Sequence, residues 1–245
     1  MSADTTTTPA INAVSVVVPV HNEATHLPGC LRHLQAAADH LLRQRPGLSV
    51  AMIFVLDRCT DDSAAILCHA ASSDPRQVLL HVDHGNVGAN RATGVKHALE
   101  LRAADGIPVE HVWLAFTDAD TRVPVDWLSR QLEWAGTGIA AVVGTIEPDR
   151  DELGERLFQL WEADYDRGED HDHIHGANLG VRADAYAAVG GFGSLAAHED
   201  VDLVQRLRRS GFRVKATGTT HAITSGRLTG RAKEGFADYL ASLDS

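Results

Sequence analysis

The chain has 245 residues, a formal net charge of −11 at pH 7, 44% hydrophobic residues and 22% charged residues. This length fits one α/β domain or two closely merged halves, and the composition is typical of a folded globular protein. The acidic balance argues against a nucleic-acid-binding protein and against a polybasic membrane anchor, because both need a positively charged face.

The start of the chain shows no targeting signal. Residues 1–10 are polar and threonine-rich, with neither a basic n-region nor an apolar h-region, and we expect residues 1–12 to form a flexible tail. No stretch reaches the ~18 apolar residues of a membrane span. The three cysteines, Cys30, Cys59 and Cys68, do not form a disulfide framework and are expected to be reduced. These features predict a cytoplasmic protein without a transmembrane segment.

The first half of the chain alternates short apolar runs with helical patterns. The runs are rich in β-branched residues and end in polar turns, which is typical of buried strands. The predicted strands are 14–20, 50–56, 78–82 and 112–117. The predicted helices are 27–42, 63–71 and 88–101. This alternation predicts an α/β fold, with a mostly parallel central sheet flanked by helices.

A less regular pattern follows in the second half. The predicted helices are 125–134, 151–165, 182–189, 199–210 and 231–240. The predicted strands are 140–146, 176–181 and 212–216. The helix 199–210 has the clearest amphipathic pattern, and Gly211 is expected to end it.

Polar groups follow each of the four strands predicted in the first half. In a parallel sheet, ligands bind beyond the carboxyl ends of the strands, so these groups are the first candidates for a binding site. They are His21, Asn22, Glu23, Asp57, Arg58, Asp83, His84, Gly85, Asn86, Asp118 and Asp120.

Asp118 and Asp120 lie two positions apart, directly after a predicted buried strand. Two carboxylates on one loop can hold a divalent cation and a sugar hydroxyl, whereas a solvated turn is the simpler explanation. Their position favours the cation, because unpaired carboxylates at the end of a buried strand are costly.

A second acidic group opens the helix 199–210. Glu199, Asp200 and Asp202 follow His198 there. Acidic residues stabilise a helix N-terminus through the helix dipole, and one of them would suffice for that purpose. The group therefore also indicates a site where a carboxylate accepts a proton.

Several further features leave alternatives open. The His-rich loop 169–175 is either a partly solvated loop, a metal site or a lid that orders over a ligand. Gly88 begins a helix where the backbone can approach an anion. Trp161 and Tyr165 share one helix face, which is explained either by packing or by a platform for an acceptor sugar.

The order of the motifs is more specific than any one of them. The blocks are VSVVVPVHNE, FVLDRCTDDS, NVGANRATG, FTDADTRVPVDWL, GANLGVRADAYAAVGGF and HEDVDLVQRLRRSGFRV. Together they span most of the chain, and the sequence resembles a family 2 glycosyltransferase of the GT-A fold. The resemblance implies a single domain over residues 13–245, with a nucleotide-sugar half at 13–120 and an acceptor and catalytic half at 121–245.

The resemblance also implies roles for individual residues. A first set would bind the nucleotide sugar: Pro19, Val20, Asn22, Glu23, Asp57, Asn86, Gly88, Arg91, Asp118 and Asn178. Asp120 would be the direct metal ligand, with His221 as a further one. Asp200 would be the catalytic base beside Glu199. Trp161 and Tyr165 are the candidates for an acceptor platform.

The implied reaction is inverting transfer of a sugar from a UDP- or GDP-linked donor to an acceptor hydroxyl, with Mn²⁺ or Mg²⁺. The acceptor would be a small molecule, a glycan or a lipid-linked molecule. Leu56 and Arg58 depart from the family's usual second block, which leaves the nucleotide open. The QxxRW motif of processive members is absent, so one sugar per encounter is expected. The alternatives are a degenerate nucleotide-sugar-binding module and a sugar nucleotidyltransferase.

Overall fold

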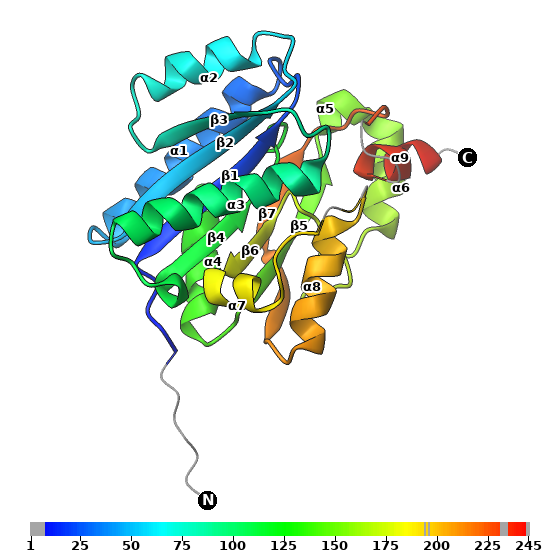
Figure 1. Cartoon of the computed structure of the whole chain (residues 1–245). Helices are drawn as coiled ribbons and strands as arrows, with labels where there is room; N and C mark the ends of the chain where they lie inside the picture. The colour runs from blue at the N-terminus through cyan, green and yellow to red at the C-terminus, as the bar shows by residue number, and fades with distance from the viewer. Residues whose placement is uncertain (1–7, 194, 196, 231–234, 244–245) are drawn as a thin grey trace, which may run out of the picture.

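A central seven-stranded sheet organises the computed structural model, in the strand order β3-β2-β1-β4-β6-β5-β7 (Figure 1). The structure describes residues 8–193, 195, 197–230 and 235–243. Within them, β1 (Ala13–Val20), β2 (Ser49–Asp57), β3 (Gln77–Val82) and β4 (Val112–Phe116) form a parallel set. This arrangement confirms the mostly parallel sheet predicted from the alternating pattern.

The other side of the sheet contains the antiparallel element. Strand β6 (Leu179–Arg182) lies between β4 and β5 (Ala141–Pro148) and is antiparallel to both. Strand β7 (Val214–Thr224) pairs with β5 in parallel and forms the edge. The sheet therefore joins the two halves of the chain without a break.

Helices cover both faces of the sheet (Figure 1). The long ones are α1 (Leu27–Gln44), α3 (Val87–Ala104), α4 (Trp127–Gly136), α6 (Glu155–Asp164) and α8 (Glu199–Arg209). The shorter ones are α2 (Ser63–Ala71), η1 (Val109–His111), α5 (Arg150–Leu153), α7 (Ala183–Ala188) and α9 (Phe236–Ser242).

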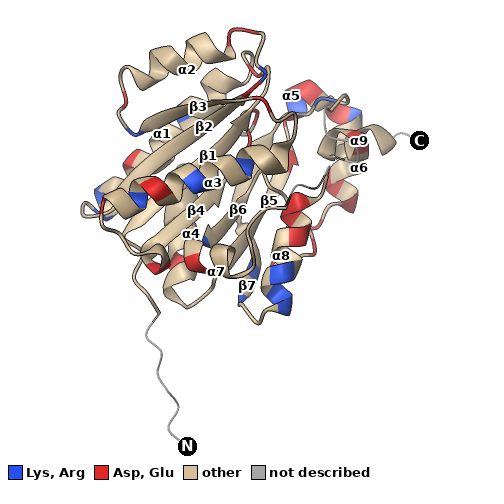
Figure 2. Ribbon diagram, viewed as in Figure 1, with Lys and Arg blue, Asp and Glu red and all other residues tan. Residues whose placement is uncertain are grey.

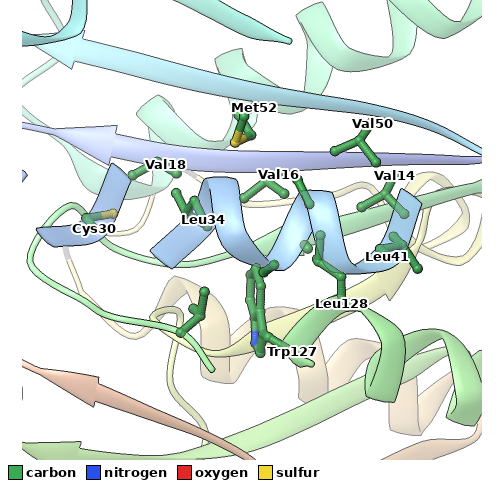
Figure 3. Close-up of a cluster of buried hydrophobic side chains, with 14 of the residues drawn as sticks. Val14, Val16, Val18, Cys30, Leu34, Leu41, Val50, Met52, Trp127 and Leu128 are labelled. Atoms are coloured by element: carbon green, nitrogen blue, oxygen red, sulfur yellow. The ribbon is translucent and has the colours of Figure 1, made fainter. Parts of the chain in front are cut away.

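Side-chain alternation along β1 divides the core into two layers. Val14, Val16 and Val18 pack with Leu34 of α1 and Trp127 of α4 on one face, as Figure 3 shows. Residues of opposite parity, beginning with Ala13 and Val17, pack under α3, α7 and α8 on the other face. Because both faces are covered, the central strands β1, β2 and β4 are buried along almost their whole length.

Some element boundaries differ from those expected. The predicted helix 151–165 is divided into α5 and α6 at Gly154, whose φ of 83° interrupts a regular helix. The predicted strand 212–216 is the start of the longer β7, and 176–181 contributes β6 only from Leu179. Residues 231–234 of the predicted last helix lie outside the described residues, and α9 begins at Phe236.

The predicted N-terminal tail, 1–12, is only partly described. Residues 1–7 lie outside the described residues. The carbonyl of Ala10 is 2.6 Å from His111 Nδ1, and the amide of Asn12 donates to the carbonyl of His111. These bonds correct the boundary, because residues 10–12 are tied to the domain.

A β-bulge interrupts the pairing of β5 with β7. Gly144 pairs with Thr217, but the next residue of β5, Thr145, pairs with His221. Asn178 occupies this irregularity, and its Nδ2 donates to the carbonyls of Thr145 (2.8 Å) and Thr220 (2.7 Å). The side chain therefore satisfies backbone oxygens at the place where the ladder is interrupted.

Candidate active site

A cleft of about 780 Å³ lies beyond the carboxyl ends of β1, β2 and β4. Residues at the N-terminal ends of α3 and α8 also line it. Most of the residues singled out in the sequence line it together: Pro19, Val20, Glu23, Asp57, Asn86, Arg91, Asp118, Asp120, Tyr165, Glu199 and Asp200. The acidic residues at the start of α8 colour its first turn red in the ribbon of Figure 2.

Asp57 shapes the end of the cleft nearest β2. Its carboxylate accepts hydrogen bonds from the amides of His84 (2.9 Å) and Gly85 (2.7 Å) and from Asn90 Nδ2 (3.0 Å). Burial opposes ionisation, but these three bonds hold the pKa of Asp57 below its ordinary value. Asp57 therefore fixes the loop that follows β3 as an ionised group.

Asn22 has a similar fixing role on the neighbouring loop. Its side-chain oxygen accepts from the amides of Thr60 (2.7 Å) and Asp61 (3.3 Å), and its own φ is 51°. Arg58, with φ of 52°, is a second non-glycine residue in the left-handed region at this edge. Such backbone strain is typical of ligand-binding loops. Unlike Glu23 beside it, Asn22 is not among the residues that line the cleft.

Asp118 and Asp120 occupy a turn directly after β4. Oδ2 of Asp120 lies 2.7 Å from Arg227 Nη2, and Oδ1 accepts from the hydroxyls of Thr121 and Thr224 at 3.3 Å. Burial and the neighbouring Asp118 carboxylate raise the pKa of Asp120 to about 6, against the opposing effect of Arg227. A positively charged group bound to the Asp120 carboxylate therefore stabilises its ionised form.

Arg91 connects the two acidic pairs. Its guanidinium donates to Asp118 Oδ1 (2.5 Å) and to Glu199, and its side chain is only 3% exposed. Glycine is required at position 176, because a Cβ there would lie about 2.6 Å from the Arg91 guanidinium. Burial raises the pKa of Glu199, and Arg91 opposes this effect. Arg91 therefore holds α8 against the Asp118 loop.

Asp200, like Glu199, lines the cleft from the start of α8. Oδ2 accepts from the amide of Gly176 (2.5 Å) and Oδ1 from its neighbour Val201 (2.8 Å). These bonds fix the carboxylate, which keeps acceptor capacity on the cleft side. Such a group can accept a proton from a bound hydroxyl.

The residues present fit a divalent cation at Asp120. The donor atoms are hard carboxylate oxygens, which suit Mg²⁺ and Mn²⁺. Within the described residues, no cluster of three or more His, Cys, Asp or Glu side chains is arranged to hold a metal. A cation here would thus take one or two carboxylates from the protein, as magnesium sites that also use substrate phosphates do.

The structure places two of the predicted site residues outside the lining of the cleft. Asn178 was expected to bind the nucleotide sugar, but its side chain is completely buried and accepts a hydrogen bond from Trp127 Nε1 (2.8 Å). With its amide bonded in the β-bulge, it has no access to a ligand. His221 was expected to bind the metal, but its Nε2 is 3.3 Å from Glu147 and it does not line the cleft.

The two aromatic residues predicted to form an acceptor platform, Trp161 and Tyr165, differ in their access to the cleft. Trp161 is fully buried beneath Tyr165, which corrects the idea that it forms an acceptor platform. Tyr165 lines the cleft, but His173 stacks on its ring at a centroid distance of 4.0 Å. The surface that faces the cleft is therefore a mixed wall that includes Tyr165, His173, His175, Phe236 and Tyr239.

The His-rich loop 169–175 is anchored along its length, which argues against a lid. Glu169 accepts from Thr217, and Asp170 pairs with Lys215. His171 is buried, and His175 Nε2 lies 2.8 Å from the Tyr165 hydroxyl. The rings of His173 and His175 stack and that of His171 is tilted against His173, and among the described residues no three His, Cys, Asp or Glu side chains are grouped to hold a metal.

Arg227 is the main cleft residue that the sequence analysis missed. It follows β7 and contacts Glu23 as well as Asp120. A signal was available, because the segment 226–235 contains three basic residues in a chain of net charge −11. Gly88 also differs from its expected role: it lies against Glu199 of α8 and is not among the residues lining the cleft.

Comparison with known proteins agrees with this geometry. The sequence profile of glycosyl transferase family 2 matches residues 15–188. The chain belongs to this family. An undecaprenyl-phosphate 4-deoxy-4-formamido-L-arabinose transferase from Klebsiella pneumoniae is 32% identical over 146 residues, which are 59% of this chain and 39% of that protein. The protein of the same name from Pseudomonas aeruginosa is 33% identical over 149 residues, 60% of this chain and 39% of that one.

This family 2 chain thus spans about two fifths of the length of these relatives. Among solved structures, the mannosyltransferase PcManGT from Pyrobaculum calidifontis, in complex with GDP-Man and Mn²⁺, has a TM-score of 0.63 at 18% identity, covering 86% of this chain and 56% of that one. GalNAc-T7 with UDP, GalNAc and Mn²⁺ has a TM-score of 0.64 at 10% identity, covering 91% and 46%. These likenesses confirm the expected GT-A-type fold. Among the described residues, no helix is both long enough and apolar enough to cross a membrane.

Proposed function

We propose that the protein is an inverting glycosyltransferase that moves a sugar from a nucleoside-diphosphate sugar to an acceptor hydroxyl with the help of Mn²⁺ or Mg²⁺. The single observation that carries the proposal is the shared cleft. Asp118 and Asp120, after β4, line the same cavity as Asp200 at the start of α8. A donor bound at the first pair would place its sugar toward Asp200.

In this mechanism Asp200 is the catalytic base. Its two bonds to the amides of Gly176 and Val201 fix its orientation, and it removes the proton as the acceptor hydroxyl attacks the anomeric carbon. The bond between that carbon and the diphosphate breaks, and the configuration inverts. A cation bound at Asp120 would stabilise the charge that develops on the leaving diphosphate.

Glu199 and Arg91 position the base rather than react. Arg91 fixes Glu199 at the first position of α8, immediately before Asp200. The nucleoside lies toward Pro19, Asp57 and Asn86, which line the far end of the cleft. The donor is proposed to be UDP- or GDP-linked.

The acceptor is proposed to bind along the wall that contains Tyr165, His173 and Tyr239. The relatives are named for transfer to undecaprenyl phosphate, so a lipid-linked acceptor is the first class to test, before glycans and small molecules. Three free cysteines fit a reducing compartment, and we therefore retain a cytoplasmic location in the proposal.

The test measures release of nucleoside diphosphate from a panel of sugar nucleotides, with and without Mn²⁺ and with each acceptor class. Asp200→Asn should lower kcat by about 10²–10⁴-fold and leave the dissociation constant of the nucleotide unchanged. Asp202→Asn is the matched control, because Asp202 is on the same helix turn but pairs with Arg206. Nucleotide binding without turnover by the wild type would instead indicate a degenerate binding module.

A further inference from the structure

Arg227 links the loops that follow two adjacent strands, β1 and β4, at the cleft. Its Nη1 lies 2.8 Å from Glu23 Oε1, after β1, and its Nη2 lies 2.7 Å from Asp120 Oδ2, after β4. The side chains of Glu23 and Asp120 are 6% and 12% exposed. A guanidinium therefore already occupies the position at Asp120 that a cation would take.

Arg91 and Arg227, the two arginines that pair with carboxylates of the turn after β4, differ in their freedom to move. Arg91 is enclosed between its two carboxylates, whereas the side chain of Arg227 is 31% exposed. The backbone beside Arg227 is fixed, because Glu152 accepts from the Ser225 hydroxyl (2.6 Å) and the Gly226 amide (3.0 Å). The Arg227 guanidinium can thus leave Asp120 by a side-chain rotation, without movement of the strand end.

We propose that Arg227 competes with the divalent cation for Asp120 and, once displaced, binds the diphosphate of the donor. A divalent cation and a guanidinium repel each other and cannot share Oδ2 of one carboxylate. Because Glu23 contacts the other nitrogen, Nη1, the displaced side chain remains at the cleft. Its planar fork of donors suits phosphate oxygens. This inference rests on the proposed transferase function and adds a donor-binding residue to it.

The first arm measures Mn²⁺ binding without nucleotide, by electron paramagnetic resonance, for the wild type, Arg227→Gln and Arg58→Gln. Arg58 is the matched control, since it lines the same cleft but pairs with Asp83, so both variants remove one positive charge. Loss of a charged hydrogen bond that competes for Asp120 should tighten Mn²⁺ binding roughly 10- to 100-fold in Arg227→Gln. Arg58→Gln should bind Mn²⁺ like the wild type.

The second arm measures UDP and GDP binding at saturating Mn²⁺ by calorimetry. Arg227→Gln should bind the preferred nucleotide about tenfold more weakly, because the diphosphate loses a charged hydrogen bond. Circular dichroism would establish that both variants keep the fold.

Three results would overturn the inference: equal Mn²⁺ affinity in wild type and Arg227→Gln, an equal gain in Arg58→Gln, or unchanged nucleotide affinity. Absence of Mn²⁺ binding in every variant would also refute the competition. None of these results would by itself remove the transferase proposal, which depends on release of nucleoside diphosphate from sugar nucleotides.

Discussion

Replacing Asn178 with alanine tests whether this residue stabilises the sheet or binds the donor. Its side chain makes three buried hydrogen bonds, to Trp127, Thr145 and Thr220, at 2.7–2.8 Å. Alanine would leave one donor and two acceptors without partners, and each such group costs about 1–3 kcal/mol. We expect the free energy of unfolding to fall by about 3–5 kcal/mol in total, because such terms add incompletely.

The assay is urea denaturation followed by tryptophan fluorescence, together with calorimetric nucleotide binding well below the thermal transition. For a domain of this size the melting temperature should fall by roughly 6–20 °C, while the nucleotide dissociation constant stays the same. Thr219→Ala, on the exposed side of the same bulge, is the control and should change stability little. Unchanged stability with lost nucleotide binding would refute the structural role and restore Asn178 as a ligand.

Two predictions concern pH. The partly buried ring of His175 has its pKa lowered to about 3, by burial and by His173, so the unfolded state binds the extra proton. The free energy of unfolding should therefore fall by up to about 1.4 kcal/mol per pH unit from about pH 6.5 toward pH 3. His175→Gln should reduce that slope. Equal slopes in the wild type and the variant would contradict this prediction. Burial raises the pKa of Asp120 to about 6, so Mn²⁺ affinity should fall up to about tenfold per pH unit below that value and level off above it. Affinity constant from pH 5 to 7.5 would exclude Asp120 as the ligand.

The parts of the site that the sequence predicted are those fixed by local pattern. Asp57 and Asp118 end or follow strands whose apolar runs are visible in the sequence, and parallel pairing brings such ends to one edge. Asp200 was found in the same way, from the acidic start of an amphipathic helix. For these residues, neighbours in the chain were sufficient to predict that they lie at one cleft, whereas the roles proposed for them come from the family resemblance.

The sequence predictions fail where contacts between residues distant in the chain determine the position of a side chain. An asparagine at position 178 could bind a ligand or fill a β-bulge, and the residue type does not distinguish these roles. Only the register of β5 against β7 shows which role Asn178 has. Trp161 has an aromatic pattern that fits a platform, but its burial depends on packing against Phe158 and Tyr165. Arg227 meets Asp120 from 107 positions away, in a segment without periodic pattern.

The β-bulge has a consequence for the chemistry of the cleft, because it sets the phase of the last strand. Gly144 pairs with Thr217, and the next residue, Thr145, pairs with His221. The residues of β7 between these two partners, 218–220, are an odd number of additional residues. Side chains alternate along a strand, so an odd insertion reverses the face on which every later residue lies. The hydroxyl of Thr224 reaches Asp120 in this phase. Insertion or deletion of one residue in the bulge would turn the Thr224 hydroxyl away from Asp120. A change of two residues would keep this hydroxyl on the same face of the strand. The length of the bulge therefore matters to the cleft as much as the identity of its residues does.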